Sequence, residues 1–139
     1  MSLFQKKDKK KIEIEVRFYL TEDGPIVLEG EESCPEGSQE DSAKFFFKVP
    51  SWGEVRVIMS AGSSIRSDGA ILDPHKFIDA RIKTLLKDWT LEDGKGKKAI
   101  ISESNIESLD PNVVDFINRQ LEAHPEIKRA FVGKDAEQA

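Results

Sequence analysis

The sequence predicts an α+β fold, because it carries two different hydrophobic periods. In residues 12–20, apolar and polar side chains alternate, as in a strand with one buried face. In residues 74–89 and 111–123, apolar side chains recur every three or four positions, as in a helix with one buried face. We therefore expect two to four antiparallel strands within residues 12–28 and 44–49, packed against three or four helices.

Length and composition indicate one folded domain with short extensions. The chain has 139 residues, of which 38% are hydrophobic and 34% charged, so it has enough apolar side chains for a core. We expect residues 12–132 to form this domain, with a β-rich part at 12–49 and a helical part at 51–123. Residues 1–11, which are rich in lysine, and residues 133–139 are expected to be flexible.

The first hairpin and the loop after it are expected before residue 43. The alternating strand at residues 12–20 is followed by an Asp23-Gly24 turn and a short strand at residues 26–28. Residues 29–42 are acidic and rich in small residues, which predicts a loop. The acidic spacing does not match a calcium-binding loop, so no metal site is expected. Cys34 can form no internal disulfide, and its acidic neighbours disfavour a reactive thiolate.

The next strand, residues 44–49, contains three consecutive phenylalanines. Phe45 and Phe47 point to one face of the sheet and Phe46 to the other, because side chains alternate along a strand. This run indicates either burial on both faces or one face that is offered to a partner.

A first helix is expected at residues 52–61. Ser51 and Glu54 form a capping box, in which each side chain accepts a hydrogen bond from the other residue's backbone. Trp52 is interpreted as a structural anchor at the start of this helix. The rival interpretation is a strand, because the same stretch is rich in β-branched residues. Residues 62–72 are expected to form a loop.

A second helix is expected at residues 74–89. Asp73 and Pro74 mark its start, because aspartate accepts hydrogen bonds from the first-turn amides and proline at the first position has no amide to leave unpaired. Trp89 ends the apolar stripe and is interpreted as the anchor of the helix end. A small hairpin is expected around Asp93-Gly94-Lys95-Gly96.

The C-terminal part repeats these signals. Ser102 or Ser104 is expected to cap a short turn. Asp110 and Pro111 then start a helix that runs to residue 123, and both are interpreted as structural anchors. One more short helix is expected at residues 125–132.

No known arrangement of catalytic residues occurs in the sequence. His75 and His124 have no nucleophile or second metal ligand at a useful spacing. Nucleophile-elbow, zinc-protease and dinucleotide-binding patterns are absent from the sequence. We therefore expect a protein without enzymatic activity, cofactor or metal. The net charge of −5 disfavours binding to nucleic acid, and no segment is long and apolar enough to predict a membrane span.

Three linked features occur between residues 82 and 121: a helix ending in tryptophan, a polar turn and a capped step into a last helix. They are carried by Ile82-Lys-Thr-Leu-Leu-Lys-Asp-Trp89-Thr-Leu, by Asp93-Gly94-Lys95, and by Ser102-x-x-Asn105-Ile106-x-x-Leu109-x-Pro111-x-x-Val114-x-x-Ile117. This combination resembles the tail assembly chaperones of tailed bacteriophages. Upstream, Phe47-x-x-Pro50-x-Trp52 is similar to the segment that opens the first helix in that family. The N-terminal β region departs from a purely helical chaperone.

The resemblance implies a non-enzymatic chaperone of the bacterial host cytoplasm. It would hold the aggregation-prone tape measure protein while the tail tube assembles, so the implied partners are the tape measure or tube protein. A holding protein needs an apolar surface. The candidate partner-binding side chains, which fit a hydrophobic core as well, are Phe45, Phe46, Phe47, Phe116, Ile117 and Leu121.

Two other functions remain open. The β region leaves room for a permanent structural subunit or adaptor of the tail or baseplate, retained in the virion. A small nucleic-acid-binding or regulatory domain, using the lysines between Lys6 and Lys11, is a third possibility. The same lysines and the acidic loop at residues 29–42 also suggest self-association, base against acid.

Overall fold

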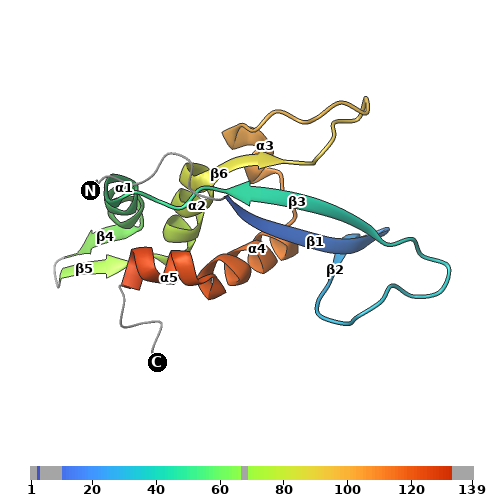
Figure 1. Cartoon of the computed structure of the whole chain (residues 1–139), viewed down its shortest axis with the longest axis horizontal. Coiled ribbons are helices and arrows are strands. Elements are labelled where there is room, and N and C mark those ends of the chain that lie inside the picture. Colours follow the sequence, from blue (N-terminus) through green and yellow to red (C-terminus); the bar gives the residue numbers. More distant parts are fainter. Residues whose placement is uncertain (1–2, 4–10, 67–68, 133–139) are drawn as a thin grey trace. The chain divides into compact units, whose positions relative to one another are not determined.

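A computed structural model of the protein confirms the α+β prediction (Figure 1). The described part of the chain forms a four-stranded antiparallel sheet on the N-terminal side and five helices, mostly in the C-terminal half. The structure describes residue 3 and residues 11–66 and 69–132, without the side chains of residues 64–70. Most of the predicted flexible ends, residues 1–11 and 133–139, therefore lies outside the described residues.

The elements lie close to their predicted positions, with three additions. In chain order they are β1 (Ile12–Thr21), β2 (Gly24–Leu28), β3 (Asp41–Phe47), α1 (Trp52–Ala61), β4 (Ser63–Arg66), β5 (Gly69–Leu72), α2 (Pro74–Leu85), β6 (Leu86–Trp89), α3 (Glu103–Glu107), α4 (Pro111–Ala123) and α5 (Pro125–Val132). The helices α1, α4 and α5 match the predicted ranges. Residues 62–72 were expected to be a loop, but β4 and β5 pair there as an antiparallel hairpin.

The chain divides into two compact units that alternate along the sequence. Unit 1 comprises Met1–Ile12, Phe47–Leu86 and Glu122–Ala139. Unit 2 comprises Glu13–Phe46 and Lys87–Leu121. That residues 12–132 fold as a single domain stays a prediction.

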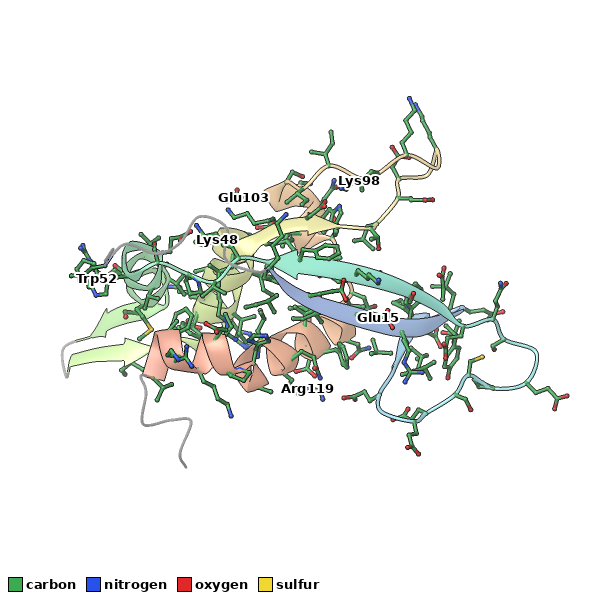
Figure 2. The ribbon with its side chains drawn as sticks, in the orientation of Figure 1. Glu15, Lys48, Trp52, Lys98, Glu103 and Arg119 are labelled. Atoms are coloured by element: carbon green, nitrogen blue, oxygen red, sulfur yellow. The ribbon has the colours of Figure 1, made fainter. Side chains whose placement is uncertain are left out.

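The four-stranded sheet lies mainly in unit 2. Its strand order is β2-β1-β3-β6 (Figure 1). The predicted hairpin is present, with Arg17 opposite Leu28 and Thr21 opposite Gly24. Side chains along β1 alternate as predicted: one face of the strand is buried, and the other carries charged side chains such as Glu15 (Figure 2). One-sided burial is the common arrangement of an antiparallel sheet.

The predicted helix at residues 74–89 is wrong in its last turn. The helix α2 ends at Leu85, and Leu86 adopts an extended conformation (φ −67°, ψ 123°) that begins β6. Pairing with β3 explains the change, because the Thr90 amide donates to the Lys44 carbonyl (3.0 Å) and the Lys44 amide to Thr90 Oγ1 (2.9 Å). Hydrogen bonds to a neighbouring strand thus outweigh the helical period.

Trp89 is a buried core residue, as predicted, but it lies in a strand of unit 2 and does not anchor the end of a helix. Its side chain is 1% exposed. Its ring meets Phe45 edge to face with the two centroids 6.3 Å apart, and its indole Nε1 donates to the Ala99 carbonyl at 2.8 Å. Both the apolar ring and the polar N–H are therefore satisfied inside unit 2.

Unit 1 is built on α1, α2 and α5. The helix interpretation of residues 52–61 is confirmed, including both halves of the Ser51–Glu54 capping box. Asp73 caps α2 through bonds from the His75 amide (3.0 Å) and the Lys76 amide (3.3 Å), and Pro74 occupies the first turn as predicted. Ile58, on α1, is fully buried and holds that helix in the unit.

Arg81 is buried in unit 1 at a position for which the sequence suggested no role. Arg81 is 2% exposed. Its guanidinium lies 4.8 Å from the centroid of the Phe77 ring and 5.9 Å from that of the Phe131 ring. Glu122 accepts a hydrogen bond from it at 3.4 Å. Burial lowers the pKa of Arg81, and Glu122 opposes that shift.

Trp52 is not a structural anchor, which corrects the prediction. Its side chain is 74% exposed, and Figure 2 shows it pointing away from α1. The Arg56 guanidinium lies 4.8 Å from its ring centroid and covers one face. Because Ile58 and not Trp52 faces the interior, the first turn of α1 displays its largest side chain to solvent.

The predicted partner-binding residues are mostly core residues in the structure. Phe46 is half-buried on the outer face of β3, and the others are buried. The buried ones are Phe45, Phe47, Phe116, Ile117 and Leu121. They fill the inner face of β3 and the inner side of α4, so they are not a free surface for a partner.

Candidate apolar binding pocket

A pocket of about 550 Å³ lies within unit 2. Its walls come from β1, the β1–β2 hairpin, β3, the residue range between α3 and the first turn of α4, and the segment after β6. The lining residues are Val16, Phe18, Leu20, Pro25, Ala43, Phe45, Leu91, Ser108, Leu109, Asp110, Pro111 and Val113. All but Ser108 and Asp110 are apolar, so the pocket is suited to hydrophobic contact.

One face of β1 forms the first wall. Val16, Phe18 and Leu20 are spaced two apart, so the strand directs all three to the same side. Their exposure rises along the strand: Val16 is 1% exposed, Phe18 is half-buried and Leu20 is 71% exposed. Pro25 lies directly opposite Leu20 in the hairpin register. The pocket therefore opens to solvent at the hairpin end of β1.

The helix caps of α3 and α4 position the opposite wall. Ser102 is the N-cap of α3, and its Oγ accepts from the Asn105 amide at 3.2 Å. At the other end, Ser108 Oγ donates to the Ser104 carbonyl at 2.8 Å, which closes the short helix. The chain then turns through Leu109 into α4, so residues 108–111 and Val113 form this wall of the pocket.

Asp110 joins the two walls and is the acidic group of the pocket. Its Oδ1 accepts from the Asn112 amide at 2.9 Å, as a helix cap. Its Oδ2 would lie only 3.3 Å from a β-carbon at Gly24. Gly24 has φ +112°, a conformation that residues other than glycine rarely adopt. Glycine therefore suits both the turn and the close approach of Asp110. Oδ2 receives no hydrogen bond from the residues that the structure describes.

The hairpin and loop beside the pocket are strongly acidic. From Phe18 to Ala43 the chain has eight acidic residues and no lysine or arginine. Glu22 and Asp23 lie in the hairpin turn, between the lining residues Leu20 and Pro25, and both are exposed. The mouth of the pocket therefore carries a local negative charge.

Two arginines of unit 2 hold the acidic loop. Arg17 donates to Glu40 at 3.3 Å and to the Glu32 carbonyl at 3.2 Å. Arg119, on α4, donates to Glu29 at 2.6 Å (Figure 2). The hydrogen bond from Arg119 lowers the pKa of Glu29 and raises that of Arg119. The expected loop at residues 29–42 ends two residues earlier than predicted, because β3 begins at Asp41 and not at residue 44. The loop is tied to β1 and α4 by these two arginines.

Only Phe45 of the six predicted partner-binding residues lines the pocket. Asp110 and Pro111, predicted as anchors, do start α4 and also line it. Leu20 was missed. An apolar side chain at the exposed end of an alternating strand, directly before a charged turn, is the sequence signal that could have pointed to the pocket.

The other candidate groups have local structural roles. His124 Nδ1 accepts from the Glu126 amide at 3.2 Å at the start of α5, and Cys34 Sγ contacts the Ser38 carbonyl at 3.4 Å. Within the described ranges, no three His, Cys, Asp or Glu side chains are placed to hold a metal ion. No helix among the described residues has the length and apolar character needed to cross a membrane.

Comparison of the chain with protein-family models, curated proteins and solved structures gives no significant match.

Proposed function

We propose that this chain is a non-enzymatic bacteriophage tail assembly protein that binds the tape measure protein in its apolar pocket. The observation that supports this proposal is that residues of one pocket wall belong to the motif shared with that family. Leu109 and Pro111 line the pocket, and both belong to the motif through which the sequence resembles the tail assembly chaperones. The segment that carries the resemblance is thus also a segment that offers an apolar surface.

The chemistry of the pocket favours binding over catalysis. A holding protein needs apolar surface that a client can share, and ten lining residues are apolar. The two polar ones have local roles, since Ser108 bonds back into α3 and Asp110 caps α4 through its Oδ1. A site of this kind suits apolar side chains of an extended or helical client segment.

A specific observation supports a second candidate, a permanent subunit of the tail or baseplate. Trp52, Arg56 and Met59 are spaced four and three apart on α1, so they lie along one face of that helix. All three are exposed, and tryptophan, arginine and methionine are the residue types that protein interfaces favour. A permanent subunit would bury this stripe in the particle.

The test compares two substitutions of exposed aliphatic residues in unit 2. Leu20→Lys places a charge at the pocket mouth, and Ile100→Lys places the same charge at a 76% exposed position outside the pocket lining. Each tagged variant is expressed during infection by the phage that encodes the chain, and captured proteins are identified by mass spectrometry. We expect wild type and Ile100→Lys to capture the tape measure protein, and Leu20→Lys to lose it at least tenfold.

Two outcomes decide between the candidates. Equal capture of the tape measure protein by Leu20→Lys and Ile100→Lys would contradict binding through the pocket. Purified virions should lack the chain if it is a transient assembly protein. Stoichiometric amounts in the virion would favour the permanent subunit, and Trp52→Ala should then reduce its incorporation.

A further inference from the structure

The pocket combines apolar walls, one carboxylate oxygen without a protein donor among the described residues, and an acidic rim. We propose that, when no client is bound, this pocket binds residues 3–11 of a second copy of the chain. This inference rests on the proposed function only in taking the pocket to be a site for a polypeptide segment.

The N-terminal segment matches the pocket in its order of residue types. Leu3 and Phe4 are apolar, and five lysines with one aspartate follow between Lys6 and Lys11. Leu3 is 96% exposed, so the chain has not buried it elsewhere. This order of residue types complements the pocket, because the apolar pair can contact the apolar walls while the lysines lie beside the acidic mouth.

Acidic groups beside the mouth of the pocket are available for the lysines. Glu29 and Glu40 are already paired with Arg119 and Arg17. Glu22 and Asp23 are exposed in the hairpin turn beside Leu20. Lys6 follows Phe4 by two residues, which spans about 7 Å in an extended chain. A phenylalanine inside the pocket thus leaves the first lysine within reach of the rim.

Chain geometry favours a second copy over the same chain. The segment leaves β1 at Ile12, whereas the pocket opens at Leu20, and eight strand residues separate these positions by about 26 Å. The nine residues from Leu3 to Ile12 span about 30 Å at most. A chain that reached its own pocket would have to be almost fully stretched, with a large loss of conformational entropy. A segment from another molecule has no such restriction.

Binding of this kind is heterologous, because the segment and the pocket are different surfaces. A pair joined by one contact keeps one free segment and one free pocket. Two molecules that exchange segments therefore close into a symmetric dimer, whereas molecules that each bind a different neighbour form larger rings or open chains. The client and the second copy compete for the same walls. Self-association would therefore cover the apolar pocket until the tape measure protein displaces the segment.

The experiment mixes two full-length variants that each break one half of the contact. The double variant Leu3→Ser/Phe4→Ser keeps its pocket, and Leu20→Lys keeps its N-terminal segment. Molar mass is measured by sedimentation across a wide range of concentrations in low salt. We expect wild type and the Ile100→Lys control to form dimers or larger species, each broken variant alone to be monomeric, and the equimolar mixture to form a one-to-one dimer and nothing larger.

A conservative variant tests the carboxylate. Asparagine also caps helices, so Asp110→Asn keeps the start of α4 and removes only the charge. We expect it to weaken self-association roughly fivefold, as for a partly exposed ion pair between Asp110 and a lysine of the bound segment, and to reduce the salt dependence of the association.

The outcomes separate this inference from the proposed function. A wild-type chain that stays monomeric, or a mixture of the two broken variants that forms no dimer, overturns the inference. Capture of the tape measure protein is measured independently with Leu20→Lys and Ile100→Lys. If Leu20→Lys loses the tape measure protein but wild type does not self-associate, the proposed function stands and the inference fails. If wild type self-associates but does not capture the tape measure protein, the inference stands and the proposed function fails.

Discussion

The two tryptophans of the chain have opposite environments, one in each unit. Trp89 in unit 2 is 1% exposed, meets the Phe45 ring edge to face and donates to a carbonyl, whereas Trp52 in unit 1 is 74% exposed and touches Arg56. The arginines show the reverse: Arg81 in unit 1 is buried, and Arg119 in unit 2 is exposed. Residue type alone therefore does not say which side chain supports the fold and which one is left for a partner.

The largest effect is expected from Trp89→Ala. Loss of the buried indole should lower the free energy of unfolding by about 3–5 kcal/mol, because the substitution leaves a cavity and removes both the edge-to-face contact with Phe45 and the hydrogen bond to Ala99. Urea unfolding measures this change. Trp89→Phe keeps an aromatic ring against Phe45 and should cost clearly less; an alanine variant as stable as wild type would break the comparison.

Gly62→Ala should have the next largest effect, because it disturbs the packing at the end of α1, the helix that carries Trp52. A β-carbon at Gly62 would lie 2.9 Å from the Phe77 β-carbon and 3.0 Å from its α-carbon. We expect a loss of about 1–3 kcal/mol in unfolding free energy, as for overpacking in a core.

The matched control is Gly53→Ala in the same helix. A β-carbon at Gly53 meets no atom within 4 Å, so alanine should stabilise the helix by up to about 1 kcal/mol. Urea unfolding of both variants, side by side, tests the contrast. Equal effects of the two substitutions would show that Phe77 does not hold the end of α1.

Trp52→Ala should change the free energy of unfolding by less than about 0.5 kcal/mol, because the side chain buries little surface. Fluorescence sharpens the comparison with Trp89. Wild type contains two tryptophans, so Trp89→Phe leaves only Trp52, which should be strongly quenched by iodide, and Trp52→Ala leaves Trp89, which should be protected. Similar quenching of both would contradict the assigned environments.

The smallest effect concerns pH and the exposed arginine. The hydrogen bond from Arg119 holds the pKa of Glu29 below its ordinary value of 4.5. A carboxyl with a lowered pKa stabilises the folded state above 4.5 and loses that contribution as the pH falls through the folded-state pKa. An NMR titration of the Glu29 carboxyl measures it. Arg119→Ala should return the pKa to its ordinary value, and an unchanged titration would show that the pair does not form in solution.

Much of the fold could be predicted because its signals are local. The alternation of β1, the Ser51–Glu54 box and the two Asp-Pro starts each act within a few residues, and the elements that they mark are all present. Residues 86–89 could not be assigned in this way. Their apolar spacing suits a helix, but a strand forms there because β3 offers hydrogen bonds from residues more than forty positions away.

The candidate site could not be predicted for the same reason. Its walls come from residues 16–25, 43–45, 91 and 108–113, and only the folded chain brings these segments together. Phe45 and Leu121 were expected to serve either a core or a partner, and periodicity cannot separate those roles. Burial decides, and it depends on which elements cover each face.

The alternation of the two units along the chain has a consequence for synthesis on the ribosome. Unit 2 needs residues 87–121 to cover the apolar face that β1 and β3 present, but the 40 residues from Phe47 to Leu86 belong to unit 1 and are made in between. At ordinary rates of translation this interval lasts roughly 2–8 s. During that time Phe45 has been synthesised but its partner Trp89 has not. We therefore expect host chaperones and the speed of elongation to influence the yield of folded protein. Neither unit can be produced as one uninterrupted fragment.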